Sequence, residues 1–291
     1  MTNDHLIEQA RKHLTRLCTE IDNRRVGSPG NQAAVAYFSD ICRSYGFEIE
    51  EGPFDCIDWQ PGTVQLEVAG QPYDASASPY SLGCQASGTL VAAGSFEELK
   101  TIPTNGTILL LHGEIAAEQL MPKRFPFYNP EHHQQIIKLL EDRAPLAIIA
   151  ATGRNPELAG GMYPFPLIED GDFHIPSVFI KDIEGERLLN HVGDMVILES
   201  SAERIPSTGS NVIARKVPSA TYQVTICAHI DAKINTPGAL DNAGGTVVLL
   251  LLIELLKDYV SDLGIEIIAF NGEDNYSAPG QVQYIQLHGH R

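Results

Sequence analysis

Apolar residues recur at helical spacing near the start of the chain and then give way to shorter extended runs. Residues 5–22 place apolar side chains three or four positions apart, which predicts an amphipathic helix. The breakers in GSPGN and a capping Asn31 precede a second helical stretch, AAVAYFSDICRSYG, which Gly46 is expected to end as a left-handed residue. Residues 47–54 and 63–68 alternate apolar and polar side chains, as strands do.

The middle of the chain has a different texture, in which glycine and proline separate short apolar runs. Between residues 88 and 200 these runs are GTLVAAG, GTILLLHG, LAIIAAT, IPSVFI and DMVILES, with one helix expected over residues 133–143. We interpret residues 78–203 as an inserted β-rich domain, and residues 1–77 and 204–291 as the two parts of one α/β domain.

The last part of the chain alternates strands with a long helix. The runs NVIARK and TYQVTICAHI predict strands, a helix is expected over residues 243–259, and GIEIIAF predicts the next strand. Near-continuous apolar strands joined through a helix are typical of a parallel sheet with both faces covered. The predicted fold class is α/β, with a mostly parallel mixed sheet covered by helices and an inserted β-rich domain.

Composition and charge narrow the possible partners and locations. The 291 residues include 37 acidic and 20 basic side chains, a formal net charge of −17, which disfavours nucleic acid as a partner. The longest apolar run, residues 247–256, contains Glu254 and is too short to span a bilayer. We therefore expect no membrane-spanning segment. The first residues carry no export signal, so we expect a cytoplasmic protein, or a secreted one if its N-terminus is processed.

Two predicted strands end in unusually polar residues. His229 and Asp231 end the first strand, Asp241 opens the long helix, and Glu273 and Asp274 follow the second strand. The carboxyl ends of parallel strands share one edge of a sheet, so these groups are expected to converge. Carboxylates crowd together only around a positive charge. Imidazole and carboxylate ligands without thiolate suit catalytic zinc, with manganese or cobalt as substitutes.

Spacing suggests separate tasks for these residues. His229 and Asp231 point to the same face of an extended strand, so Asp231 can fix the tautomer of the imidazole. Asp241 either caps the long helix or bridges metals. Glu273 and Asp274 point opposite ways if extended, so one can bind metal while the other acts as general base. The pair His132-His133, at a helix start, is expected to be a solvated helix end rather than a metal site.

These motifs resemble a known family. HID, GALDNAGG and IEIIAFNGED follow the HxD, GAxDNxxG and FxxxExE-like signatures of the zinc aminopeptidases of metallopeptidase family 28, the aminopeptidase Y and bacterial leucyl aminopeptidase group. The stretches RRVGSPGNQAAVAYFSDICRSYGFEIE and STGSNVIAR are similar to other parts of that family. The β-rich stretch resembles the protease-associated domain that many members carry as an insertion.

The resemblance implies a role for each position. His229 would bind one zinc ion, Asp241 would bridge two, Asp274 would bind the second, and Asp231 would orient His229. Glu273 would be the general base that takes a proton from a metal-activated water. The implied activity is hydrolysis of N-terminal residues from peptides that have a free N-terminus.

The chain departs from the family pattern at two places. Asp274 stands where members usually have glutamate, one methylene longer. A later aspartate ligand and a late histidine ligand do not occur before Arg291, so we expect a C-terminally incomplete catalytic domain that binds one zinc ion or none. Two alternatives follow: a catalytically impaired or non-catalytic peptide-binding relative, and a single-zinc enzyme similar to glutaminyl cyclases.

Overall fold

The computed structural model describes residues 2–154 and 161–289, which form two compact units. Unit 1 combines Met1–Asp58 with Pro206–Arg291, and unit 2 is Trp59–Ile205. The first boundary lies earlier than the expected change between residues 77 and 78, because the strands that directly follow it pair within the sheet of unit 2. The chain thus leaves and re-enters unit 1 through two long strands.

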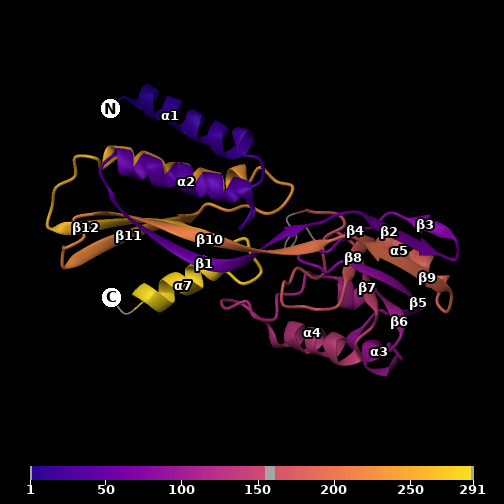
Figure 1. Ribbon diagram of the computed structural model, residues 1–291. Coiled ribbons are helices and arrows are strands. Elements are labelled where there is room, and N and C mark those ends of the chain that lie inside the picture. Colours follow the sequence, from indigo (N-terminus) through magenta and orange to yellow (C-terminus); the bar gives the residue numbers. More distant parts are fainter. Residues whose placement is uncertain (1, 155–160, 290–291) are drawn as a thin grey trace. The chain divides into compact units, whose positions relative to one another are not determined.

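Unit 1 is a mixed sheet covered by helices, as the sequence predicts. Its strands have the order β1-β10-β12-β11; β11 and β12 are parallel, and β10 is antiparallel to β12. Within this unit, α1 and α2 lie on one face of the sheet and α7 on the other (Figure 1). The elements are α1 (Asn3–Thr15), η1 (Arg16–Glu20), α2 (Pro29–Ser44), β1 (Glu48–Gln60), β10 (Glu203–Lys216), β11 (Tyr222–His229), η3 (Ala239–Ala243), α6 (Gly244–Leu255), β12 (Leu263–Phe270) and α7 (Pro279–His288).

The helices of unit 1 form because their apolar faces share one core with the sheet. Leu17, Phe38, Ile253 and Ile267 are fully buried in this core and come from η1, α2, α6 and β12 respectively. Helix α6 is apolar around most of its circumference, which suits a helix buried between the sheet and other helices. It ends at Leu255, earlier than the expected residue 259.

The start of α2 corrects one expectation. Ser28, rather than Asn31, is the N-cap: Ser28 Oγ accepts a hydrogen bond from the backbone N–H of Asn31 at 3.1 Å. The side chain of Asn31 is instead fully buried. Gly46 follows the helix with a φ of +72°, which confirms its predicted role as a left-handed terminating residue.

Unit 2 contains more helix than its sequence texture suggests. Helices α3 and α5 are present in addition to the expected α4. The sequence did not predict them, because runs this short show no clear helical periodicity. The sheet has the order β3-β2-β9-β5-β6-β7-β8-β4, and its central strands β5 to β8 are parallel. The elements are β2 (Val64–Val68), β3 (Gln71–Tyr73), β4 (Ser76–Ala77), β5 (Cys84–Ala93), α3 (Phe96–Thr101), β6 (Thr107–Leu111), η2 (Gly113–Ala116), α4 (Glu131–Arg143), β7 (Ala147–Thr152), β8 (Ser177–Lys181), α5 (Asp182–Leu189) and β9 (Met195–Ser200).

Alternating side chains of the central strands fill two separate cores in unit 2. Leu109 of β6 packs with Leu140 of α4, whereas the neighbouring Leu110 packs with Leu188 of α5. This alternation explains why β6 and β7 are apolar at nearly every position. Within residues 2–154 and 161–289, none of the helices has the length and hydropathy that a bilayer crossing requires.

Candidate metal centre

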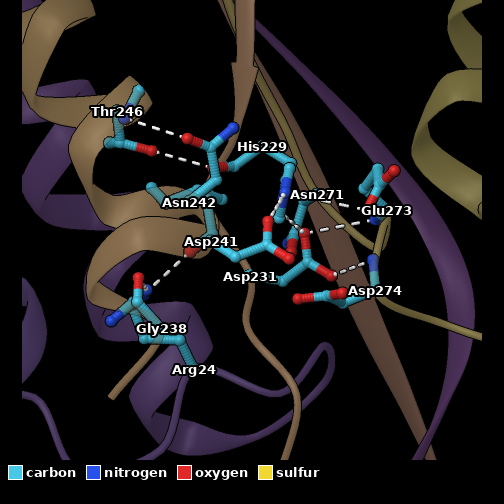
Figure 2. A network of polar contacts seen from close by, with 12 residues as sticks. Arg24, His229, Asp231, Gly238, Asp241, Asn242, Thr246, Asn271, Glu273 and Asp274 are labelled. Carbon is cyan, nitrogen blue, oxygen red and sulfur yellow. Dashed lines mark hydrogen bonds and ion pairs between the residues drawn. The ribbon is translucent and has the colours of Figure 1, made fainter. Parts of the chain in front are cut away.

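The candidate site lies where two parallel strands of unit 1 end together. His229, the last residue of β11, pairs with Phe270, the last residue of β12. The chain after β11 therefore emerges beside the chain after β12. Figure 2 shows the side chains of His229, Asp231, Asp241, Glu273 and Asp274 grouped at this edge.

The distances among these groups are those of a compact polar cluster. His229 Nε2 lies 2.9 Å from Asp241 Oδ1 and 3.6 Å from Glu273 Oε2, and its Nδ1 lies 3.5 Å from Asp231 Oδ1. Candidate ligand atoms of His229, Asp241 and Asp274 all lie within 4.8 Å of one another. The structure thus brings together all five residues that the sequence singled out.

Asp231 contacts backbone as well as the imidazole. Its carboxylate is 1% exposed and accepts hydrogen bonds from the backbone N–H of Glu273 at 3.2 Å and of Asp274 at 3.0 Å. The sequence pointed only to its contact with His229. Asp231 therefore also holds the turn that presents Glu273 and Asp274, so it links the ends of β11 and β12.

Asp241 does not cap the long helix. The N-cap of α6 is Ala243, which makes no side-chain capping hydrogen bond, and Asn242 Oδ1 accepts the backbone N–H of Gly245 at 2.9 Å. Asp241 has non-helical backbone angles, and its side chain bonds to His229 while 77% of it remains exposed. The capping interpretation is therefore wrong, and the carboxylate of Asp241 is available to bind a cation.

Glu273 and Asp274 lie in a turn rather than in an extended strand. The side chain of Glu273 is 47% exposed at the rim of the cluster. Asp274 lies deeper: burial and the nearby carboxylate of Asp231 raise its pKa to about 7. The two adjacent carboxylates thus occupy different environments, although they do not alternate along an extended strand as the separation of their roles assumed.

The imidazole experiences the same excess of negative charge. Burial alone would lower the pKa of His229, but its interaction with Asp231, together with Asp274 and Glu273, outweighs burial and raises the pKa to about 9. The gathered carboxylates therefore stabilise the protonated form of His229. A divalent cation would supply more positive charge at the same place.

The donor set fits a zinc ion. One imidazole nitrogen and carboxylate oxygens are established zinc ligands, and bonds of about 2.0–2.2 Å bring the ligands of one ion to about 3–4 Å from each other. The candidate atoms of His229, Asp241 and Asp274 lie within 4.8 Å of one another, close to that spacing. Asp231 beside Nδ1 leaves Nε2 as the coordinating atom.

A second histidine cluster, in unit 2, is less suited to a cation. Glu118 Oε1 lies 3.0 Å from His132 Nε2 and 3.1 Å from His133 Nε2. His133 Nδ1 accepts the backbone N–H of Met121 at 3.1 Å, so the neutral ring carries its proton on Nε2, the atom that faces Glu118. His133 is 3% exposed and is not the solvated residue that the sequence suggested.

The sequence did not reveal the buried residues whose hydrogen bonds hold the backbone next to the site. Arg24 is buried among backbone carbonyls next to the site, and Asn271, just before the Glu273 turn, pairs with Asn31. The sequence signals were the motif RRVGSPGN, which contains Arg24 and Asn31, and the motif IEIIAFNGED, which contains Asn271. Its basic and amide side chains gave no indication of burial.

Comparisons with known proteins agree with the geometry. Residues 211–288 match the family model of Peptidase family M28, and this segment contains all five site residues. The chain is 25% identical over 275 residues to the probable lipoprotein aminopeptidase LpqL of Mycobacterium tuberculosis, covering 90% of this chain and 51% of that protein. It is 33% identical over 112 residues to aminopeptidase YwaD of Bacillus subtilis, covering 38% of this chain and 24% of that protein. The chain thus spans about half of LpqL and about a quarter of YwaD.

Solved structures share the fold. An aminopeptidase from Aneurinibacillus sp. strain AM-1 superimposes with a TM-score of 0.73 at 22% identity, covering 98% of this chain and 66% of that one. BSAP, a zinc aminopeptidase from Bacillus subtilis, gives a TM-score of 0.64 at 22% identity, covering 90% and 60%. The predicted α/β fold is confirmed, and the similarity to peptidase family M28 covers residues 211–288.

Proposed function

We propose, from the premise that residues 211–288 belong to peptidase family M28, that this chain carries the zinc site and general base of an aminopeptidase. The observation that carries the proposal is the grouping of His229, Asp241 and Asp274, with ligand atoms within 4.8 Å. We assign these three residues as the ones that would hold a zinc ion.

The remaining residues move and position protons. Bound zinc would supply Lewis-acid polarisation of the scissile carbonyl and lower the pKa of water. Glu273, half-exposed and 3.6 Å from His229, takes a proton from the attacking water and returns it to the leaving amine. Asp231 holds the turn at Glu273 and Asp274 through their backbone N–H groups, so the general base keeps its place beside the ligands.

The proposed substrates are peptides with a free N-terminus. Four carboxylates, from Asp231, Asp241, Glu273 and Asp274, surround one imidazole at this edge. Their negative charge favours a positively charged amino group near the ligands. Peptides with a blocked N-terminus lack that group and are expected to react far more slowly.

Hydrolysis of aminoacyl-4-nitroanilides by the zinc-loaded chain tests the proposal. Glu273→Gln is expected to lower kcat at least about 100-fold while zinc affinity is retained, because the general base is lost and the ligands remain. Glu51→Gln is the matched control: it lies in the same unit, is also 47% exposed, and pairs with Arg43 away from the site. An unchanged rate for Glu273→Gln would contradict the assignment.

Other products would identify the alternatives. Cyclisation of N-terminal glutamine without release of an amino acid would favour the glutaminyl-cyclase alternative. Zinc and peptide binding without turnover would favour the non-catalytic alternative.

We also assign unit 2 to the protease-associated type. This assignment is supported by the place of unit 2 in the sequence, between the two parts of unit 1. The cytoplasmic location stays a prediction, which cell fractionation tests.

A further inference from the structure

A buried arginine lies directly beneath the candidate metal centre. Arg24 is 2% exposed, and Figure 2 shows it beside Gly238. Four hydrogen bonds of its guanidinium go to backbone carbonyl oxygens. Nε donates to Ile230 at 2.9 Å, Nη1 to Leu17 at 2.5 Å and to Pro237 at 2.7 Å, and Nη2 to Gly238 at 3.1 Å.

Three of these carbonyls belong to the segment that carries two proposed ligands. Ile230 lies between His229 and Asp231, and Gly238 precedes Asp241 by three residues. One planar guanidinium therefore joins the backbone next to His229 to the backbone before Asp241. Because its donors form a rigid fork, it fixes the separation of the two points more tightly than a flexible ammonium group would.

The close approach of backbone and guanidinium depends on glycine. A Cβ at Gly238 would lie 2.8 Å from Arg24 Nη2 and 2.7 Å from Asp241 O, and the residue has a φ of +54°. A larger residue would push the loop away from the guanidinium. The loop is thus shaped to fit the arginine at the point where the chain turns toward Asp241.

The backbone of Arg24 is itself tied to the second ligand-bearing strand. Its carbonyl accepts hydrogen bonds from Asn31 Nδ2 at 3.1 Å and from the backbone N–H of Ala232 at 3.3 Å. The amide of Asn31 pairs with that of Asn271, two residues before Glu273. Arg24 is therefore held between the chain after β11 and the chain after β12.

We propose that Arg24 is a positioning residue of the metal centre. Its hydrogen bonds fix residues 230–238, so that the side chains of His229 and Asp241 already have the spacing of two ligands of one cation before a cation binds. The inference rests on the zinc site of the proposed function, and it is independent of peptide hydrolysis. A preformed site binds more tightly because the loop is already ordered in the free protein.

Zinc titration of two matched variants of the 291-residue chain tests this role. Arg24→Lys keeps the positive charge but loses the fork, and we expect its zinc affinity to fall about 10–100-fold, as for other residues that orient metal ligands. Arg25→Lys is the control. Arg25 is adjacent, 8% exposed and also uses its guanidinium, but it bonds to Asp58 through Nε at 2.8 Å. Its zinc affinity is expected to equal that of the wild type.

Substitution by cobalt adds a readout of geometry. The visible absorption of bound Co²⁺ depends on the arrangement of its ligands, so Arg24→Lys is expected to alter the spectrum and Arg25→Lys to leave it unchanged. Wild-type zinc affinity and an unchanged cobalt spectrum in Arg24→Lys would overturn the inference alone. No cation binding by the wild-type chain would overturn both the inference and the proposed function.

Hydrogen exchange of the metal-free wild type tests the same point without a variant. The amide of Ala232 donates to Arg24 O, and that of Ala243 donates to Gly238 O at 2.9 Å. If Arg24 preorganises the loop, both amides are protected before any cation is added. Exchange of both at the rate of an unstructured chain, with protection appearing only on addition of zinc, would overturn the inference.

Discussion

Arg215 and Glu266 face each other across the antiparallel strands β10 and β12, with Arg215 Nε 2.6 Å from Glu266 Oε2. The side chains are 11% and 5% exposed. Glu266 also accepts hydrogen bonds from Tyr284 of α7 at 2.5 Å and from Thr225 of β11 at 3.2 Å. The buried carboxylate of Glu266 on β12 thus contacts both neighbouring strands, β10 and β11, and also helix α7, which lies on the opposite face of the sheet from α1 and α2.

This carboxylate makes the stability of unit 1 sensitive to acid. Burial alone would raise the pKa of Glu266, but hydrogen bonds from Tyr284 and Arg215 outweigh it and lower the pKa below the ordinary value of a glutamate. A lowered folded-state pKa adds stability above the unfolded value, and this stability is lost as the pH falls through the folded value. We therefore expect Glu266→Gln to cost about 1–3 kcal/mol at pH 7.

Urea unfolding between pH 7 and pH 3 checks this prediction. Glu266→Gln is expected to show a shallower loss of unfolding free energy toward acid than the wild type. Glu97→Gln serves as control because its side chain is 79% exposed in a surface pair with Lys100. Parallel acid profiles for wild type and Glu266→Gln would contradict the prediction.

The reciprocal amide pair of Asn31 and Asn271 is expected to be intolerant of charge. Asn31 Nδ2 donates to Asn271 Oδ1 at 2.8 Å, Asn271 Nδ2 donates back at 2.9 Å, and both side chains are fully buried. Asn31→Asp removes two donors and places a carboxylate against an amide oxygen, so we expect a loss of about 1–3 kcal/mol in thermal unfolding. The same change at exposed Asn190 should stay within about 0.5 kcal/mol. Equal melting of the two variants would refute this.

Two adjacent leucines of α5 test the packing of unit 2. Leu188 is fully buried between α5 and the sheet, whereas Leu189 is 37% exposed. Leu188→Ala is expected to lower the unfolding free energy of unit 2 by about 2–5 kcal/mol because it leaves a cavity. Leu189→Ala is expected to cost far less. Similar denaturant midpoints for both variants would argue against the described packing of α5.

Zinc is expected to stabilise the chain through its ligands. A ligand that binds only the folded state adds about 2.7 kcal/mol at a concentration 100 times its Kd, so zinc should raise Tm and a chelator should reverse the rise. Asp274→Asn should lose most of this shift, because it removes a proposed ligand. Asp262→Asn, an exposed aspartate of the same unit, should retain it. A full zinc-induced shift in Asp274→Asn would exclude Asp274 as a ligand.

The convergence of the site residues could be predicted because chain order determines it. A strand, a helix and a second strand in sequence favour a parallel pair, and parallel strands end at one edge. His229 and Phe270 are register partners for this reason. Asp241 was ambiguous, because an aspartate before an apolar helix has the same sequence signature whether it caps the helix or binds a metal.

The supporting contacts could not be predicted, since they join side chains to backbone groups or other side chains far away in the chain. Asp231 reaches amide groups 42 and 43 residues away, and Arg24 reaches a carbonyl 206 residues away. Such bonds leave no periodic pattern in the sequence. Asn31 was mistaken for a cap because its partner, Asn271, lies 240 residues away.

The proposed function requires that His229, Asp241 and Asp274 share a divalent cation. A crystal structure of the zinc-soaked chain, with anomalous data collected on both sides of the zinc edge, tests it most directly. We expect a zinc peak bonded to His229 Nε2 and to carboxylate oxygens of Asp241 and Asp274, and none beside Glu118, His132 and His133. A zinc peak in unit 2, with none at the end of β11, would contradict it.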